Sequence, residues 1–326
     1  MIKVGLKGRF RLEVREAGTN NLKRVREFDN LITNRGLDGY GYGYGTISGC
    51  CVGTGTNTPT VNDTILGNQL AVTGSASYSY KKSVKNDNDV WVSEANIRYR
   101  FDVGKATGNL TEVGICNGKA VTANDYVLWS RALILNEENE PTALPVLENE
   151  YLDVYYTLYM YPDLTDGSFT FSIDGEEYQC TSRIAWVQYS ACRISDRYGP
   201  DLVVEKTAIN NIYAGDDCKL GTIEQGIQDS TKNSGIDSVW WPNVGDWIDY
   251  IPGTYYRDNY WDFKLDQCNL EGGIRAMVIG PRTASDRQPG RCLFNQTQVL
   301  LDHPIPKTQW NSIRITLRQS WGRYED

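Results

Sequence analysis

Alternation of apolar and polar residues constrains this chain more than any other feature. The stretch KVGLKGRFRLEV near the N-terminus alternates in this way, and the pattern returns in VWVSEANIRYRFDV, YVLWSRALIL, YLDVYYTLYMY and SIRITLRQSW. A period of two is typical of strands that bury one face. Clusters of Gly, Asn, Asp and Pro separate these stretches at spacings suited to antiparallel sheets. The sequence therefore predicts a mainly β fold of two antiparallel β-sandwich or barrel-like domains with a few short helices.

Two segments interrupt the strand pattern and predict short helices. One is LITNRGLD, residues 31–38. The other is NDTILGNQL, residues 62–70, in which Asp63 is a suitable N-cap and Ile65, Leu66 and Leu70 fall on one helical face.

The length of 326 residues exceeds the size at which one hydrophobic core usually keeps growing, so we expect two domains. Residues 162–168, PDLTDGS, collect turn formers, and we place the division there, giving domains of residues 1–162 and 163–326. The second domain opens with FTFSIDGEEYQC, whose Asp174-Gly175 pair predicts a type I′ hairpin. Further on, the polar stretch DDCKLGTIEQGIQDSTKNSGIDS predicts a long irregular loop.

The charge balance argues against nucleic acid as a partner. With 33 basic and 41 acidic residues the formal charge is −8, so there is no electrostatic attraction to a phosphate backbone. The apolar runs are far shorter than the ~18 residues of a membrane span, and we expect no membrane insertion. The charged, alternating N-terminal stretch differs from a signal peptide, which predicts synthesis and folding in a cytoplasm.

The tract GYGYGYG raises the question of a phosphate-binding loop. Such a loop places its glycines after a strand and before a helix, whereas here a helix-compatible segment comes first and no P-loop lysine follows. Nucleotide binding is therefore disfavoured. We expect a packed or interfacial loop in which the glycines permit close approach and Tyr40, Tyr42 and Tyr44 are candidate contact residues.

The residues for common catalytic and metal sites are sparse. The only histidine, His303, lies in the proline-rich segment LDHPIPKTQW, and catalysis through it is disfavoured. The eight cysteines show no C-x-x-C spacing, and the N-terminal stretch differs from a secretion signal, so we expect buried free thiols rather than disulfides. We expect neither a metal ion nor an organic cofactor, and no enzymatic activity.

An aromatic segment, residues 239–261, contains eight Trp or Tyr residues among 23. Aromatic faces stack on sugar rings, and glycoside hydrolysis would need a carboxylate pair, for which the candidates are Glu176-Glu177, Asp216-Asp217, Asp246 and Asp249. Burial in a sheet core or against a partner chain is the favoured interpretation. The candidate interface residues are Trp240, Trp241, Trp247, Tyr255, Tyr256 and Trp261.

Four segments of the sequence are informative beyond their amino-acid composition. They are FDNLITNRGLDGYG, VGTGTNTPTVNDTILGNQL, YRFDVGKATGNLTEVGI and VLWSRALILNEENEPTALPVLENEYLDVYYTLYMYP. In this order, from Phe28 to Pro162, they resemble a module of tailed-bacteriophage virion proteins described as tail-fibre-like or tail-associated. The segment KTQWNSIRITLRQSWGRY resembles the closing strands of such proteins.

Arg131 in the block WSRALIL interrupts an apolar strand. A buried arginine needs a carboxylate or carbonyl partner, and Glu112 of the TEVGI block is the partner that we predict.

The resemblance implies a structural role in the virion tail region: an adaptor, collar, baseplate or fibre-attachment protein, made in the host cytoplasm. It would assemble in several copies with itself and with other tail or fibre proteins. The alternative is a receptor-binding module that recognises host surface glycan through Trp240, Trp241, Trp247 and Tyr255. A glycan-cleaving tailspike is a third hypothesis.

Overall fold

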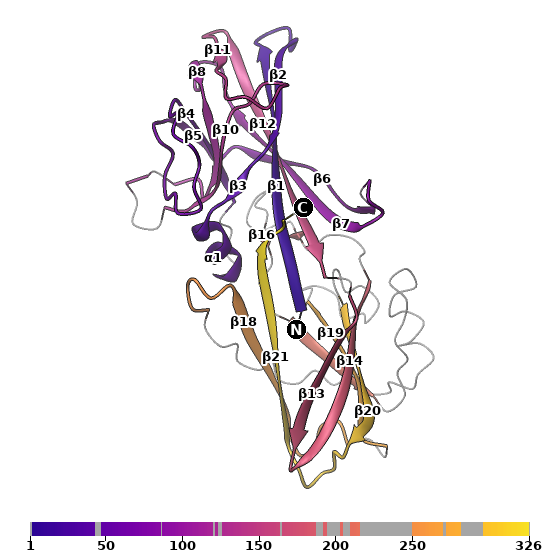
Figure 1. The fold of residues 1–326 in the computed structure, drawn as a ribbon. Helices are drawn as coiled ribbons and strands as arrows, with labels where there is room; N and C mark the ends of the chain where they lie inside the picture. Colours follow the sequence, from indigo (N-terminus) through magenta and orange to yellow (C-terminus); the bar gives the residue numbers. More distant parts are fainter. Residues whose placement is uncertain are drawn as a thin grey trace.

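The computed structural model describes residues 2–42, 47–85, 87–119, 121–122, 126–163, 165–186, 192–193, 203–204, 209–215, 250–269, 272–281 and 296–325. This part of the chain is mainly β, with one α-helix and several antiparallel sheets, none of which closes on itself (Figure 1). The predicted fold class is confirmed, and the open sheets favour sandwich-like packing. No described helix is both long enough and apolar enough to cross a bilayer.

The largest sheet has seven strands and runs along much of the molecule (Figure 1). Its order is β18-β21-β1-β12-β7-β6, and β2 also pairs with β1. The strands are β1 (Ile2–Glu16), β2 (Leu22–Asp29), β6 (Ala76–Lys85), β7 (Trp91–Phe101), β12 (Glu150–Pro162), β18 (Tyr256–Phe263) and β21 (Ile313–Arg323). Strand β1 pairs with β12 over its length and with β21 in parallel over its first residues.

Strand β1 shows why this sheet forms. Its even-numbered side chains Val4, Leu6, Phe10, Leu12 and Val14 are buried, as the alternation predicted. The odd-numbered positions carry mostly charged side chains toward the other face. Each strand thus buries one face and leaves the other for polar contacts.

A five-stranded sheet packs on this apolar face, in the order β3-β10-β9-β4-β5. Its strands are β3 (Leu31–Ile32), β4 (Gly49–Gly53), β5 (Gln69–Thr73), β9 (Glu112–Cys116) and β10 (Leu128–Leu133), and a separate pair joins β8 (Gly108–Leu110) to β11 (Leu144–Val146). Trp129 of β10 and Tyr156 of β12 belong to the shared core, and the Trp129 indole N–H donates to the Tyr156 hydroxyl at 3.2 Å. The two sheets form a sandwich.

Helix α1 (Asn34–Tyr42) follows Thr33, whose hydroxyl accepts a hydrogen bond from the Gly36 N–H at 2.9 Å and so caps the helix. The helix continues past the predicted segment into the Gly-Tyr tract. A Cβ at Gly41 would lie 2.7 Å from both Trp321 and Tyr250. The lack of a side chain at Gly41 therefore allows Trp321 and Tyr250 to pack directly against helix α1.

The second predicted helix, residues 62–70, is wrong. The segment forms a turn and bends and then enters β5. The Asp63 carboxylate accepts hydrogen bonds from the N–H and hydroxyl of Thr60, which closes a turn before any helix begins. Of its three apolar residues only Leu66 is buried, while Ile65 and Leu70 are exposed.

A second five-stranded sheet lies within residues 163–326 and has the order β13-β14-β20-β19-β17. Its strands are β13 (Gly167–Ile173), β14 (Glu176–Trp186), β17 (Ile209–Gly215), β19 (Ile274–Pro281) and β20 (Gln296–Ile305), and β15 (Cys192–Arg193) pairs with β16 (Val203–Val204) outside it. Asp174 and Gly175 join β13 to β14 with φ values of 52° and 86°, as a type I′ turn requires. The predicted hairpin is confirmed.

The predicted division at Pro162 coincides with the end of β12, and the second five-stranded sheet lies wholly beyond it. The two halves are nevertheless joined, because β18 and β21 pair into the sheet built by residues 1–162. Trp321 belongs to the first core, whereas Phe263 and Ile313 belong to the second. In Figure 1, β21 runs from the second sheet to a position beside β1.

Candidate assembly surface

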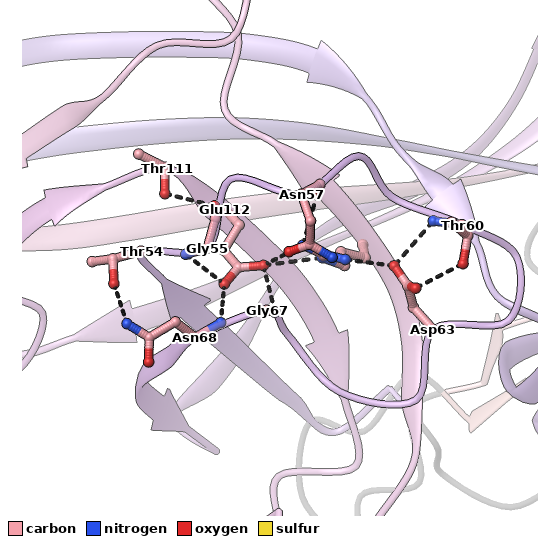
Figure 2. A network of polar contacts seen from close by, with 10 residues as sticks. Thr54, Gly55, Asn57, Thr60, Asp63, Gly67, Asn68, Thr111 and Glu112 are labelled. Carbon is pink, nitrogen blue, oxygen red and sulfur yellow. Dashed lines mark hydrogen bonds and ion pairs between the residues drawn. The ribbon is translucent and has the colours of Figure 1, made fainter.

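Glu112 on β9 organises the loop of residues 54–68 and is completely buried. One of its carboxylate oxygens accepts from the backbone N–H groups of Gly55 at 2.9 Å and Asn68 at 2.8 Å. The other accepts from the Gly67 N–H at 2.9 Å and from Arg131 Nε at 3.0 Å. Figure 2 shows how both ends of the loop converge on this carboxylate.

Arg131 on β10 is 1% exposed and completes the network. The predicted contact with Glu112 is present, and the guanidinium also donates to Asp63 Oδ2 at 2.6 Å. The same guanidinium reaches the backbone carbonyl of Asn57 at 3.1 Å and its side-chain oxygen at 2.9 Å. Asn57 and Asp63 were not predicted as partners of Arg131, although both are polar residues in the block that precedes Glu112.

The network is built for rigidity. Burial raises the pKa of Asp63, but hydrogen bonds from Thr60 and the nearby Arg131 guanidinium outweigh that effect and hold the pKa below its usual range. Each oxygen of Glu112 already accepts two hydrogen bonds, so the carboxylate is saturated by donors. It fixes a loop that presents Ile65 to solvent.

The outer face of the seven-stranded sheet carries tyrosines and arginines. Opposite residues of neighbouring strands lie on the same face, and β1, β12 and β7 bring Arg11, Tyr155 and Arg98 into one row. We call the surface formed by these strands the tyrosine–arginine face. Its residues are Arg9, Arg11, Arg15, Arg98, Arg100, Tyr151, Tyr155 and Tyr159.

Two acidic groups beneath this face hold three of its arginines, Arg11, Arg15 and Arg100. The Glu13 side chain is only 7% exposed and accepts from Arg11 at 2.9 Å and Arg15 at 2.6 Å, whereas Arg11 itself is 45% exposed. Asp153 accepts two hydrogen bonds from Arg100, both at 2.7 Å. Burial raises the pKa of Glu13, but its hydrogen bonds from Arg15 and Arg11 win and lower it overall. The guanidinium groups and tyrosine rings therefore form the outer layer.

Three of the predicted interface tyrosines have described surroundings. Tyr40 is 5% exposed and its ring centroid lies 5.3 Å from that of Trp321, so it is packed in the core, as in the first of the two alternatives for this tract. Tyr255 is half-buried and packs against the first core. Tyr256 is also half-buried, with Arg318 lying 3.7 Å over its ring.

The remaining interface predictions stay untested. Tyr44, Trp240, Trp241 and Trp247 lie outside the described residues. The backbones of Tyr42 in α1 and Trp261 in β18 are described, but their side-chain surroundings are not. Of the carboxylate candidates, Glu176 and Glu177 are exposed at the start of β14, and Asp216, Asp217, Asp246 and Asp249 lie outside the described residues.

His303 of β20 is held in place by contacts with neighbouring side chains. Its ring stacks on Tyr178 with centroids 4.4 Å apart, and Nδ1 lies 2.9 Å from the Asp302 carboxylate. Within the described residues no group of three His, Cys, Asp or Glu could hold a metal ion. Five cysteines of that same part are free and buried, as predicted: Cys50, Cys51, Cys116, Cys180 and Cys268.

No family model, curated protein or solved structure matches this chain at a significant level. The site must therefore be interpreted from its own chemistry. The described surface offers a rigid loop and a tyrosine–arginine face, which are features suited to contacts with other macromolecules.

Proposed function

We propose that this chain is a non-enzymatic structural component of a bacteriophage tail, acting as an adaptor, collar, baseplate or fibre-attachment protein through protein–protein contacts. The observation that carries the proposal is the tyrosine–arginine face. Tyrosine and arginine are enriched in protein interfaces and dominate their binding energy. Arg11, Arg15 and Arg100 on this face are already oriented by buried carboxylates, which reduces the entropy lost when a partner binds.

The sequence resemblance between Phe28 and Pro162 supports the assignment to a virion tail. The residues of the resembling blocks include Glu112 and Arg131, whose network fixes the loop of residues 54–68. A rigid surface loop suits a protein that must fit neighbours repeatedly within an assembly. The partners that we propose are other copies of this chain and other tail or fibre proteins, in particles assembled in a bacterial cytoplasm.

The test measures incorporation into phage particles when the chain is supplied from a plasmid. Gradient-purified particles should contain wild-type protein at a fixed copy number, quantified by mass spectrometry. The double variant Arg11→Ala/Tyr155→Ala should fold, judged by circular dichroism, but should be depleted at least tenfold from particles. Arg314→Ala is the matched control, because Arg314 is an exposed arginine of β21, outside the three strands β1, β12 and β7 of this face, and is paired with Asp262 of β18.

Two outcomes would overturn the proposal. The wild-type chain could be missing from purified particles, or the double variant could be incorporated as well as Arg314→Ala. Binding of the free protein to a host glycan array, lost on substitution of exposed aromatic residues, would instead favour the receptor-binding alternative.

A further inference from the structure

Strand β13 contains a palindrome. Its sequence GSFTFSI includes Ser168-Phe169-Thr170-Phe171-Ser172, which reads the same in both directions about Thr170. The strand is at the edge of its five-stranded sheet and pairs, among the described residues, with β14 alone. It carries no charged residue, although the chain as a whole has a formal charge of −8.

The hairpin turn determines which backbone groups face the open edge. In a two-residue type I′ hairpin the residues that flank the turn, here Ile173 and Glu176, exchange both hydrogen bonds. Hydrogen-bonded pairs then recur at every second residue, so Phe169 and Phe171 also bond to β14. The N–H and C=O groups of the intervening residues Ser168, Thr170 and Ser172 therefore point away from β14, toward the open edge.

We propose that β13 pairs antiparallel with β13 of a second copy of this chain, about a two-fold axis through Thr170. In this register Thr170 pairs with Thr170 of the second copy, and Ser168 pairs with Ser172 of the second copy. The backbone N–H and C=O groups of these residues face the open edge. The register set by the palindrome therefore pairs residues that are free to form hydrogen bonds with the second copy. The two five-stranded sheets become one continuous sheet, in an isologous contact.

The side chains suit this contact. Directly opposite residues share a face of the sheet, so Phe169 would lie against Phe171 of the second copy. Both phenylalanines are only partly buried at the edge of the second core. The polar face would bring the hydroxyls of Ser168, Thr170 and Ser172 together. At each end, Asp166 is already held by Arg183 through hydrogen bonds of 2.8 and 2.6 Å, which neutralises it beside Asp174 of the second copy.

The other described edge strands of five or more residues suit self-pairing less well. Strands β2, β6 and β18 carry charged residues along their length, the usual protection of an edge against pairing. Strands β5 (QLAVT) and β17 (INNIYAG) are uncharged, but β5 contains no palindrome. The palindrome of β17, Ile209-Asn210-Asn211-Ile212, has an even number of residues, so its centre falls between two residues. A two-fold axis there would set an edge-facing residue opposite one whose backbone groups face the other way, which does not match an antiparallel hydrogen-bond pattern. This inference rests on the self-association within the proposed function and specifies the strand that makes it.

Cysteine crosslinking tests the register. Hydrogen-bonded antiparallel pairs have Cα atoms about 5.5 Å apart, within disulfide range, so Thr170→Cys should form a disulfide-linked dimer on mild oxidation. Ser168→Cys alone should not, because the two copies of position 168 would be separated by about four residues of strand, roughly 13 Å. A mixture of Ser168→Cys and Ser172→Cys chains should crosslink. Oxidised wild type controls for the native cysteines.

The inference would be overturned if oxidised Thr170→Cys gave no more dimer than oxidised wild type. It would also be overturned if Ser168→Cys alone crosslinked as much as Thr170→Cys. Light scattering gives a readout without a disulfide. The wild type should have at least twice the chain mass of 36.8 kDa, and Thr170→Pro should halve the measured mass. Proline removes an N–H that faces the open edge, so the hairpin with β14 is retained. Thr170→Lys, which sets two like charges together at the axis, should do the same.

Monomeric wild type, or an undiminished mass in both variants, would contradict the pairing. The two proposals fail separately. A dimer that depends on Thr170 but is missing from phage particles would overturn the tail function and leave the β13 contact standing. If the wild-type chain is monomeric in solution but is incorporated into particles, the β13 contact is overturned and the tail function stands.

Discussion

At the scale of single residues, the pairing of Glu112 with Arg131 decides the form of a whole loop. Both side chains are buried, and their remaining hydrogen-bonding groups are satisfied by Gly55, Gly67 and Asn68 or by Asn57 and Asp63. A buried arginine in an apolar strand could be recognised from the sequence because it demands a partner. Its contacts with Asn57 and Asp63 depend on the path of the loop and could not be predicted.

Replacing Glu112 with Gln should lower the free energy of unfolding by about 3 to 5 kcal/mol, because Arg131 loses a buried counter-charge. The amide also faces donors with an N–H₂ group of its own. Urea denaturation measures the change. Glu27→Gln is the control, since Glu27 is 42% exposed and its ion pair with Arg9 should contribute less than about 1 kcal/mol. Equal stability of Glu112→Gln and wild type would contradict the assigned role.

The Asp63 carboxylate predicts a response to acid. Its folded pKa lies below its ordinary value of 3.8, so its stabilising contribution is present above that pH. The contribution is lost as the pH falls through the folded pKa. The stability difference between wild type and Asp63→Asn should therefore be constant near neutral pH and shrink below about pH 3.8. A difference that grows as the pH falls would contradict this assignment.

At the scale of elements, short sequence patterns predicted the turn and the helix that are determined by interactions between residues close in sequence. The hairpin at Asp174-Gly175 and the first helix follow from turn and capping chemistry, and both are present. The segment of residues 62–70 has helical spacing, but the Asp63 carboxylate forms a turn and an ion pair instead. Tyr40 is packed rather than exposed, but the residue that covers it, Trp321, lies near the C-terminus and could not be identified from the sequence.

The type I′ turn can be tested directly. Gly175 has φ of 86°, a conformation that costs a residue with a Cβ about 1 kcal/mol, so Gly175→Ala should destabilise the protein by about that amount. Gly322→Ala is the matched control, because a Cβ there also meets open space but the backbone needs no positive φ. Thermal unfolding compares the two. Equal melting temperatures for the two variants would argue against the turn type.

At the scale of the whole molecule, the decisive feature is the return of β18 and β21 to the first sheet. Alternation in a sequence shows which face of a strand is buried, but it does not show which strand is its neighbour. The parallel pairing of Ile2 with Gln319 joins the two ends of the chain, and nothing local encodes it. The turn formers of residues 162–168 are visible in the sequence, whereas the pairing of β18 and β21 with the first sheet is not.

Substitution of Trp321 tests how much the pairing of β21 with the first sheet contributes to the free energy of unfolding. It is 4% exposed, packs against Tyr40 and Tyr250, and donates its indole N–H to the Leu37 carbonyl at 2.8 Å. Trp321→Ala should cost about 3 to 5 kcal/mol by urea denaturation. Trp310→Ala should change little, because that tryptophan is 82% exposed. A similar effect of the two substitutions would mean that β21 does not hold the halves together.

We propose that the chain works as a structural part of a phage tail. Cryo-electron microscopy of intact particles tests it most directly, by locating the seven-stranded sheet and the sandwich that it forms. We predict density for this fold in the tail region, with Arg11, Tyr155 and their neighbours on the tyrosine–arginine face covered by another protein chain. Particles without such density, or with that face open to solvent in every copy, would contradict the account.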